Sequence, residues 1–79
     1  MDTRELWDNA LTEIELSVSK ANFSTWFKNT RITRAESGVV YLGVPNEFVK
    51  DWLNNKYHKF ILGALRNVSE KVRGIEYVV

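Results

Sequence analysis

The side chains best suited to acid–base or nucleophilic chemistry are few in this sequence and poorly spaced for it. Glu13 and Glu15 are two residues apart, so on a helix they point to different sides and do not share one substrate. His58 is the one histidine, it lies between Tyr57 and Lys59, and the chain has no cysteine. These residues do not assemble a nucleophile, a base and an oxyanion site. We therefore predict that the chain is not an enzyme and holds neither a metal ion nor a cofactor.

Motifs for nucleotide and nucleic-acid binding are missing as well. The sequence has no glycine-rich phosphate loop, and its four glycines never form the GXXG loop of a KH domain. The formal net charge is +1, from 11 basic and 10 acidic residues, which is not the strong positive field of a dedicated nucleic-acid binder. A modest basic character comes from Lys20, Lys28, Arg31 and Arg34. It could favour an acidic partner or a weak contact with single-stranded DNA.

Two amphipathic helices are predicted in the first third of the chain. Thr3 can cap a helix that begins at Arg4, and its apolar residues recur at three- and four-residue steps. These apolar residues are Trp7, Ala10, Leu11, Ile14 and Val18. Ser19 can cap a second, short helix that fades near Thr30. Its aromatic residues are Phe23, Trp26 and Phe27.

The remaining chain is predicted to form a hairpin, a long helix and a third strand. The Ser37-Gly38 pair supplies the turn of the hairpin, and Pro45 ends its second strand. Asn46 caps the long helix, in which a kink or break is expected at Asn54-Asn55. Residues 75–79 alternate between apolar and polar types as a strand does. The order helix, helix, strand, strand, helix, strand indicates an α+β fold, with a three-stranded sheet and helices packed on one face.

Length and composition favour one domain over residues 1–79. A chain of 79 residues with 44% hydrophobic side chains builds one core and rarely two. No apolar run approaches the length of a membrane span, and the start is acidic and polar, so we expect a soluble, cytoplasmic domain. The strand-like ending suggests a domain cut from a longer protein.

The position of Phe48 on the long helix is unusual. The apolar stripe of this helix, at about 100° per residue, consists of Val49, Leu53, Tyr57, Phe60, Ala64 and Val68. Trp52 lies at the edge of the stripe. Phe48 falls roughly 150° from its centre, which predicts an exposed ring and a candidate interface anchor. The alternative is that the preceding hairpin covers this ring.

A set of aromatic motifs follows in order along the chain. It consists of Leu6-Trp7, FSTWF at residues 23–27, PNEFVKDWL at 45–53 and KY at 56–57. These motifs resemble the N-terminal domain of the bacterial replication initiator DnaA, over nearly the whole chain. The string P-N-x-F-x-x-D-W with its trailing K-Y is specific, and the upstream F-x-x-W adds independent support.

The resemblance implies a compact KH-like domain without the glycine clamp, acting as a protein-interaction domain. In that family the domain self-associates, helps to load the replicative helicase at the unwound origin and docks regulators of initiation. Some members also touch single-stranded DNA weakly. The ATPase domain, with its ATP, and the domain that binds double-stranded DNA lie further along the full protein. No cofactor is therefore expected in this chain.

Individual residues carry over from the family at matching positions. Trp7, next to Leu6, matches a position of self-association, while its periodicity also indicates core packing, and both can hold. Phe48 matches an exposed ring that contacts the helicase. Asn22 matches a position where some members have an acidic residue used in helicase and DNA contacts, so a charge-dependent role does not transfer. The positions that look like family core are Phe23, Trp26, Trp52 and Tyr57.

We therefore hypothesise a nonenzymatic interaction domain of a replication initiator. Its partner face lies around Asn22 and Phe48, and its self-association face around Leu6 and Trp7. The alternative is a KH-like module that binds single-stranded nucleic acid weakly and directly. Its contact residues would be Lys20, Lys28 and Arg31. A second alternative is a stand-alone protein that shares this fold and serves another assembly.

Overall fold

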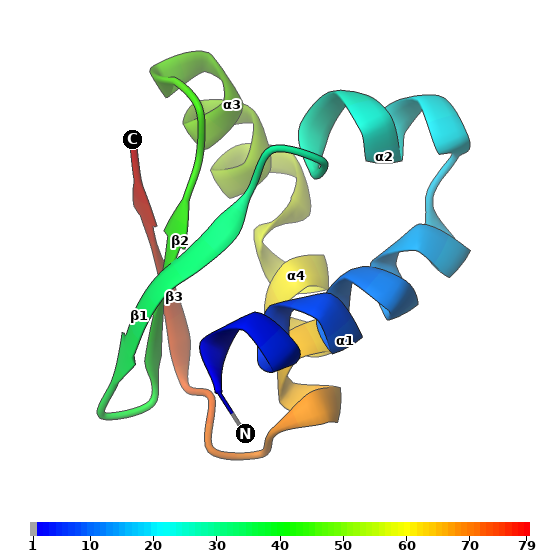
Figure 1. The fold of residues 1–79 in the computed structure, drawn as a ribbon. Coiled ribbons are helices and arrows are strands. Elements are labelled where there is room, and N and C mark those ends of the chain that lie inside the picture. Colours follow the sequence, from blue (N-terminus) through cyan, green and yellow to red (C-terminus); the bar gives the residue numbers. More distant parts are fainter. Residues whose placement is uncertain (1) are drawn as a thin grey trace.

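The computed structural model describes residues 2–79, which form a sheet with helices packed on one side of it (Figure 1). The elements are α1 (Thr3–Ser17), α2 (Lys20–Trp26), β1 (Arg31–Glu36), β2 (Val39–Gly43), α3 (Glu47–Trp52), the π-helical turn η1 (Leu53–Tyr57), α4 (His58–Val68) and β3 (Gly74–Val78). The strand order is β1-β2-β3, with β1 antiparallel and β3 parallel to the central strand β2. Because α3, η1 and α4 follow one another directly, the predicted α+β fold and its element order are confirmed.

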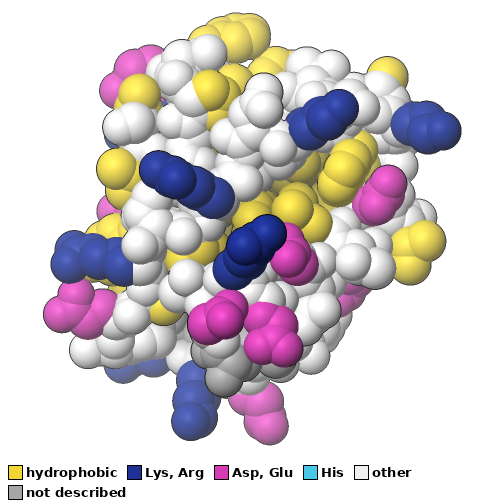
Figure 2. Space-filling model, in the orientation of Figure 1, with side chains coloured by type: hydrophobic (Ala, Val, Ile, Leu, Met, Phe, Trp, Pro, Cys, Tyr) yellow, Lys and Arg dark blue, Asp and Glu magenta, His cyan; other side chains and the backbone are white. Residues whose placement is uncertain are grey.

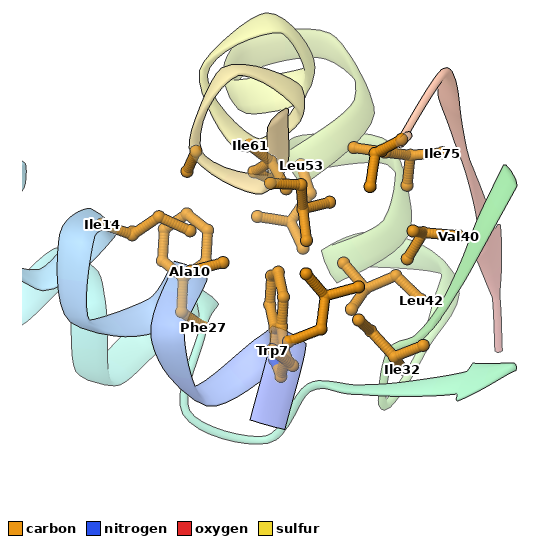
Figure 3. Packing of buried hydrophobic residues seen from close by; sticks show 14 of the residues in the cluster. Trp7, Ala10, Ile14, Phe27, Ile32, Val40, Leu42, Leu53, Ile61 and Ile75 are labelled. Atoms are coloured by element: carbon orange, nitrogen blue, oxygen red, sulfur yellow. The ribbon is translucent and has the colours of Figure 1, made fainter. Parts of the chain in front are cut away.

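A cluster of buried apolar side chains joins α1, the long helical region and the inner face of the sheet (Figure 3). Its labelled members are Trp7, Ala10, Ile14, Phe27, Ile32, Val40, Leu42, Leu53, Ile61 and Ile75. On β2 and just after it, Val40, Leu42 and Val44 are buried in alternation, as a strand with one covered face requires. Removing this apolar surface from water is the main favourable term in folding.

Side chains cap the first three helices. The Asp2 carboxylate accepts a hydrogen bond from the backbone N–H of Glu5 at 2.8 Å, so α1 begins at Thr3. The prediction of Thr3 as the cap is therefore wrong by one residue, and the anionic cap also interacts favourably with the helix dipole. The predicted caps of α2 and α3, Ser19 and Asn46, are confirmed.

The turn η1 adds one residue to the long helical region and thereby resets its buried face. The buried side chains of this region include Val49 before the turn, Leu53 at its first position, and Ile61 and Leu65 after it. In an uninterrupted α-helix these residues would spread over an arc of about 160°, because each four-residue step overshoots a full turn by about 40°. One extra residue in a π-helical turn takes up about 100° and narrows the arc to about 60°.

This reset corrects one prediction and explains another. Phe60 is predicted on the apolar stripe, but its side chain is 36% exposed, and Ile61 is fully buried in its place. The predicted stripe requires about 100° at every step of the helix, and the π-helical turn departs from that value across Asn54-Asn55. The irregularity expected at that pair is present as the π-helical turn.

The hairpin between β1 and β2 turns on two residues in the left-handed region of φ. The angle is 53° at Ser37 and 83° at Gly38, the combination that a type I′ turn requires. A Cβ atom at Gly38 would lie 2.8 Å from the backbone oxygen of Lys71 and 2.8 Å from Cδ of Arg73. The Gly38 carbonyl accepts hydrogen bonds from the backbone N–H groups of Arg73 (2.7 Å) and Gly74 (3.4 Å). The turn is thus tied to the start of β3.

Alkaline pH is expected to destabilise the domain through Tyr77 on β3. Its hydroxyl lies 3.1 Å from Nδ1 of His58, and burial raises the pKa of Tyr77 from 10.0 to about 12. Because the pKa of Tyr77 is higher in the folded state, its protonated hydroxyl contributes to the free energy of unfolding. This contribution is fully present below pH 10.0 and is lost as the pH rises towards 12. Denaturant titrations at several pH values should show the free energy of unfolding falling in this window, and falling less in Tyr77→Phe.

The matched control is Tyr41→Phe, because Tyr41 lies between the buried Val40 and Leu42 and so faces the open side of the sheet. Tyr41→Phe should retain the alkaline loss of the wild type. An equally steep loss in Tyr77→Phe would contradict the assignment to Tyr77.

Candidate protein-interaction site

Three aromatic rings from α2 and α3 gather at the surface where these helices meet. The Trp26 ring lies 5.6 Å from the Phe48 ring and 4.7 Å from the Trp52 ring, measured between centroids. Trp26 and Trp52 are nearly parallel, with an interplanar angle of 16°. The Lys56 ammonium lies 5.7 Å from the centroid of Trp52, within cation–π range. We call Trp26, Phe48 and Trp52 the aromatic platform.

Helical spacing brings the predicted partner residues to this platform. Phe48 and Trp52 are four residues apart on α3, and Asn22 and Trp26 are four apart on α2, so each pair shares a helix face. Asn22 is exposed one turn before Trp26, and Phe48 contacts Trp26 from α3. The structure thus places Asn22 one helical turn before the tryptophan that Phe48 contacts.

The three rings differ in burial. Phe48 is 68% exposed, so the prediction that it leaves the apolar stripe is confirmed. Trp26 is half-buried and packs against the core, which makes its prediction as a core residue right only in part. Trp52 is half-buried, stacks on Trp26 and stays outside the buried cluster, so its prediction as a core residue is wrong. Among residues 2–79 its buried indole N–H has no hydrogen-bond partner.

Leu6 and Trp7, the predicted self-association pair, lie in the core. Trp7 is 3% exposed and Leu6 8% exposed. The indole N–H of Trp7 donates to the carbonyl oxygen and the hydroxyl of Thr30, at 3.2 and 3.1 Å. Thr30 itself donates to the carbonyl of Phe27. This chain of hydrogen bonds fixes α1 to the connection between α2 and β1.

The basic residues singled out in the sequence do not form one patch. Lys28, in the connection that leads into β1, and Arg31, the first residue of β1, are exposed, and both line two surface hollows of about 300 and 400 Å³. Lys20 lies at the opposite end of α2 and lines neither hollow. Arg34 lies 4.1 Å from the centroid of the Tyr41 ring and forms an ion pair with Glu36.

The residues with possible acid–base chemistry remain apart in the fold. Glu13 accepts a hydrogen bond from the Asn67 amide at 2.6 Å, and His58 contacts Tyr77. Within residues 2–79 there is no group of three side chains able to hold a metal ion. In the same part of the chain, no helix is long and apolar enough to cross a membrane.

The family model of the DnaA N-terminal domain matches residues 4–67. The chain belongs to the DnaA N-terminal domain family. It is therefore a domain of a DnaA replication initiator, as the aromatic motifs indicate. The match includes Asn22 and every residue of the aromatic platform, whereas β3 lies beyond it.

Membership of the DnaA N-terminal domain family implies protein partners in replication initiation. Phe48 in the aromatic platform is one of three large apolar side chains exposed in the matched part of the domain, with Leu16 and Phe60. From the sequence, Phe48 and Asn22 are proposed as partner residues, while Trp26 and Trp52 are assigned to the core. The signal that could have found them is the four-residue spacing of Trp26 from Asn22 and of Trp52 from Phe48.

Proposed function

We propose that this DnaA N-terminal domain is a nonenzymatic interaction module that recruits the replicative helicase to the origin. Asn22 and the aromatic platform form its contact surface, and regulators of initiation dock on the domain as well. The observation that carries the proposal is the Phe48 ring, which is 68% exposed and rests on Trp26. A large exposed ring supported by half-buried tryptophans has the properties of an interface anchor.

The platform holds its rings in place before a partner arrives. Trp26 packs against the core and stacks on Trp52, and these contacts restrict the motion of both indoles. Ordering side chains at an interface costs free energy, and a surface ordered in advance avoids part of that cost. Asn22 adds a polar amide one helical turn from Trp26, which gives an apolar centre a polar rim.

Self-association through α1 is part of this proposal. Leu6 and Trp7 have little exposed surface, so they contribute by holding α1 in position and do not themselves provide the contact area. Weak contact with single-stranded DNA through Lys20, Lys28 and Arg31 receives less support. These three side chains do not meet in one groove, and a net charge of +1 gives little attraction for phosphates.

Phe48→Ala is expected to weaken helicase binding about 30-fold or more, because truncation of a central aromatic anchor typically costs about 2 kcal/mol or more. Thermal stability should stay nearly unchanged, since the ring is mostly exposed. Calorimetric titration with helicase and a thermal melt measure the two quantities separately.

The matched control is Leu16→Ala, which removes another large apolar side chain, 86% exposed, from α1. Leu16→Ala should bind the helicase as the wild type does. A large fall in melting temperature for Phe48→Ala, or equal binding losses in both variants, would refute the contact role of Phe48.

A further inference from the structure

A hollow of about 400 Å³ lies between the first turns of α1 and the connection from α2 into β1. Its apolar floor consists of Trp7, Leu11 and Ile32. In Figure 2 apolar atoms are visible in the middle of this face, bordered by dark blue cationic and magenta acidic side chains. This hollow is separate from the aromatic platform, because it shares no residue with it.

The rim of the hollow is mainly cationic. Arg4, Lys28 and Arg31 line it, against a single carboxylate from Asp8. All four side chains belong to exposed residues, and within residues 2–79 none of the three cations has a carboxylate in ion-pairing range. The rim thus carries positive charge, and no carboxylate of the described residues forms an ion pair with it.

The floor of the hollow favours an aliphatic side chain over a nucleobase. Base binding by single-strand proteins uses exposed aromatic faces on which bases stack. The ring in this hollow belongs to Trp7, which is 3% exposed and whose indole N–H already donates to Thr30. Leu11 and Ile32 offer further apolar surface without a stacking face.

We propose that this hollow binds an acidic peptide segment of a partner protein. One aliphatic side chain of the segment sits on the floor, and flanking carboxylates pair with Arg4, Lys28 and Arg31. Lys28 and Arg31 also line the neighbouring hollow of about 300 Å³, so an extended segment can continue across them. The proposal does not depend on helicase recruitment by the aromatic platform.

The test is an NMR titration of the isotope-labelled chain with an octapeptide of alternating glutamate and leucine. Trp7 reports on the hollow through its indole N–H, while Trp26 and Trp52 report on the platform. We expect the Trp7 indole and the Thr30 amide to shift and the other two indoles to stay in place. The affinity should fall about fivefold or more in the double variant Lys28→Glu with Arg31→Glu, since two ion pairs are reversed.

The matched control is Lys59→Glu with Arg66→Glu, which changes the net charge equally at exposed positions on α4. It should bind the peptide within about twofold of the wild type, because distant exposed charges are screened. Arg4→Gln provides a milder second variant, also expected to weaken binding, in case the double reversal unfolds the chain.

Three results would overturn the proposal. The first is equal binding of a glutamine–leucine octapeptide, which removes the role of charge. The second is displacement of the acidic peptide by a decamer of oligothymidylate, which makes the hollow a nucleic-acid site. The third is a shift of the Trp7 indole with protein concentration alone, which assigns the hollow to a second copy of the chain.

Discussion

Deletion of Gly63 is expected to destabilise this domain strongly, whereas deletion of Asn55 is expected to leave its stability largely intact. Both residues are exposed and lie in the same long helical region, Asn55 in η1 and Gly63 in the regular helix α4. The turn η1 already has one residue more than an α-helix would place there. Deletion of Asn55 removes this extra residue, converts η1 into α-helix and keeps Val49 and Leu65 on one face.

A deletion within α4 has no such compensation. It rotates Ala64 and Leu65 by about 100° relative to Ile61 and turns them out of the core. Leu65 is fully buried, and the loss of such a side chain from a core costs roughly 2–5 kcal/mol. The free energy of unfolding of a domain of 79 residues is roughly 4–12 kcal/mol in total. Chemical denaturation followed by circular dichroism, with amide spectra of both deletions, measures the contrast.

Equal stability of the two deletion variants would show that the long helix tolerates any change in its phase, meaning the direction in which its residues point around the helix axis. Unfolding of the Asn55 variant alone would show that η1 has a role beyond phase. Either result would contradict the account of the π-helical turn given by the burial pattern.

Trp7→Ala is expected to destabilise the domain by roughly 3–5 kcal/mol. The variant loses the largest side chain that α1 buries, and Thr30 loses the indole N–H that it accepts from. A domain of this size then retains little stability, so the melting temperature should fall steeply. Thermal melts and denaturant titrations measure the change.

Trp7→Phe separates packing from hydrogen bonding at the same position. It keeps most of the apolar volume and removes the indole donor, so we expect a smaller loss, of about 1–3 kcal/mol. Sedimentation of both variants should show self-association weakening in parallel with stability. Weaker self-association in Trp7→Ala at unchanged stability would instead show that Trp7 contacts the second copy directly. That result would contradict the role that its burial indicates.

Most of the fold could be predicted because local signals and burial agree along the chain. Ser19 and Asn46 begin helices as cap residues do, and the Ser37-Gly38 pair forms the predicted turn. The phase of the long helix could not be predicted. Asn54-Asn55 indicates a weak point, but whether the chain kinks, breaks or adds a residue depends on which side chains the sheet and α1 bury. Phe60 is misplaced for that reason.

The candidate site was predicted as separate residues, and its arrangement was not. The angle of Phe48 on its helix indicates exposure without reference to any other element. The contact of Phe48 with Trp26 depends on how α2 packs against α3, and these two helices are separated in sequence by the whole hairpin. Trp52 has the composition of a core residue, and only the position of Trp26 shows where it stacks.

The parallel pairing of β3 with β2 implies an order of events as the chain folds. The hairpin of β1 and β2 closes through two residues and can form within microseconds. β3 reaches β2 only after the long crossover through α3 and α4 has closed, which costs more chain entropy. The Gly38 carbonyl oxygen, which the turn positions early, then accepts hydrogen bonds from the backbone N–H groups of Arg73 and Gly74. Until β3 pairs with β2, the side of β2 that faces away from β1 has unpaired backbone N–H and C=O groups. The partly folded chain is therefore expected to aggregate most readily in this interval.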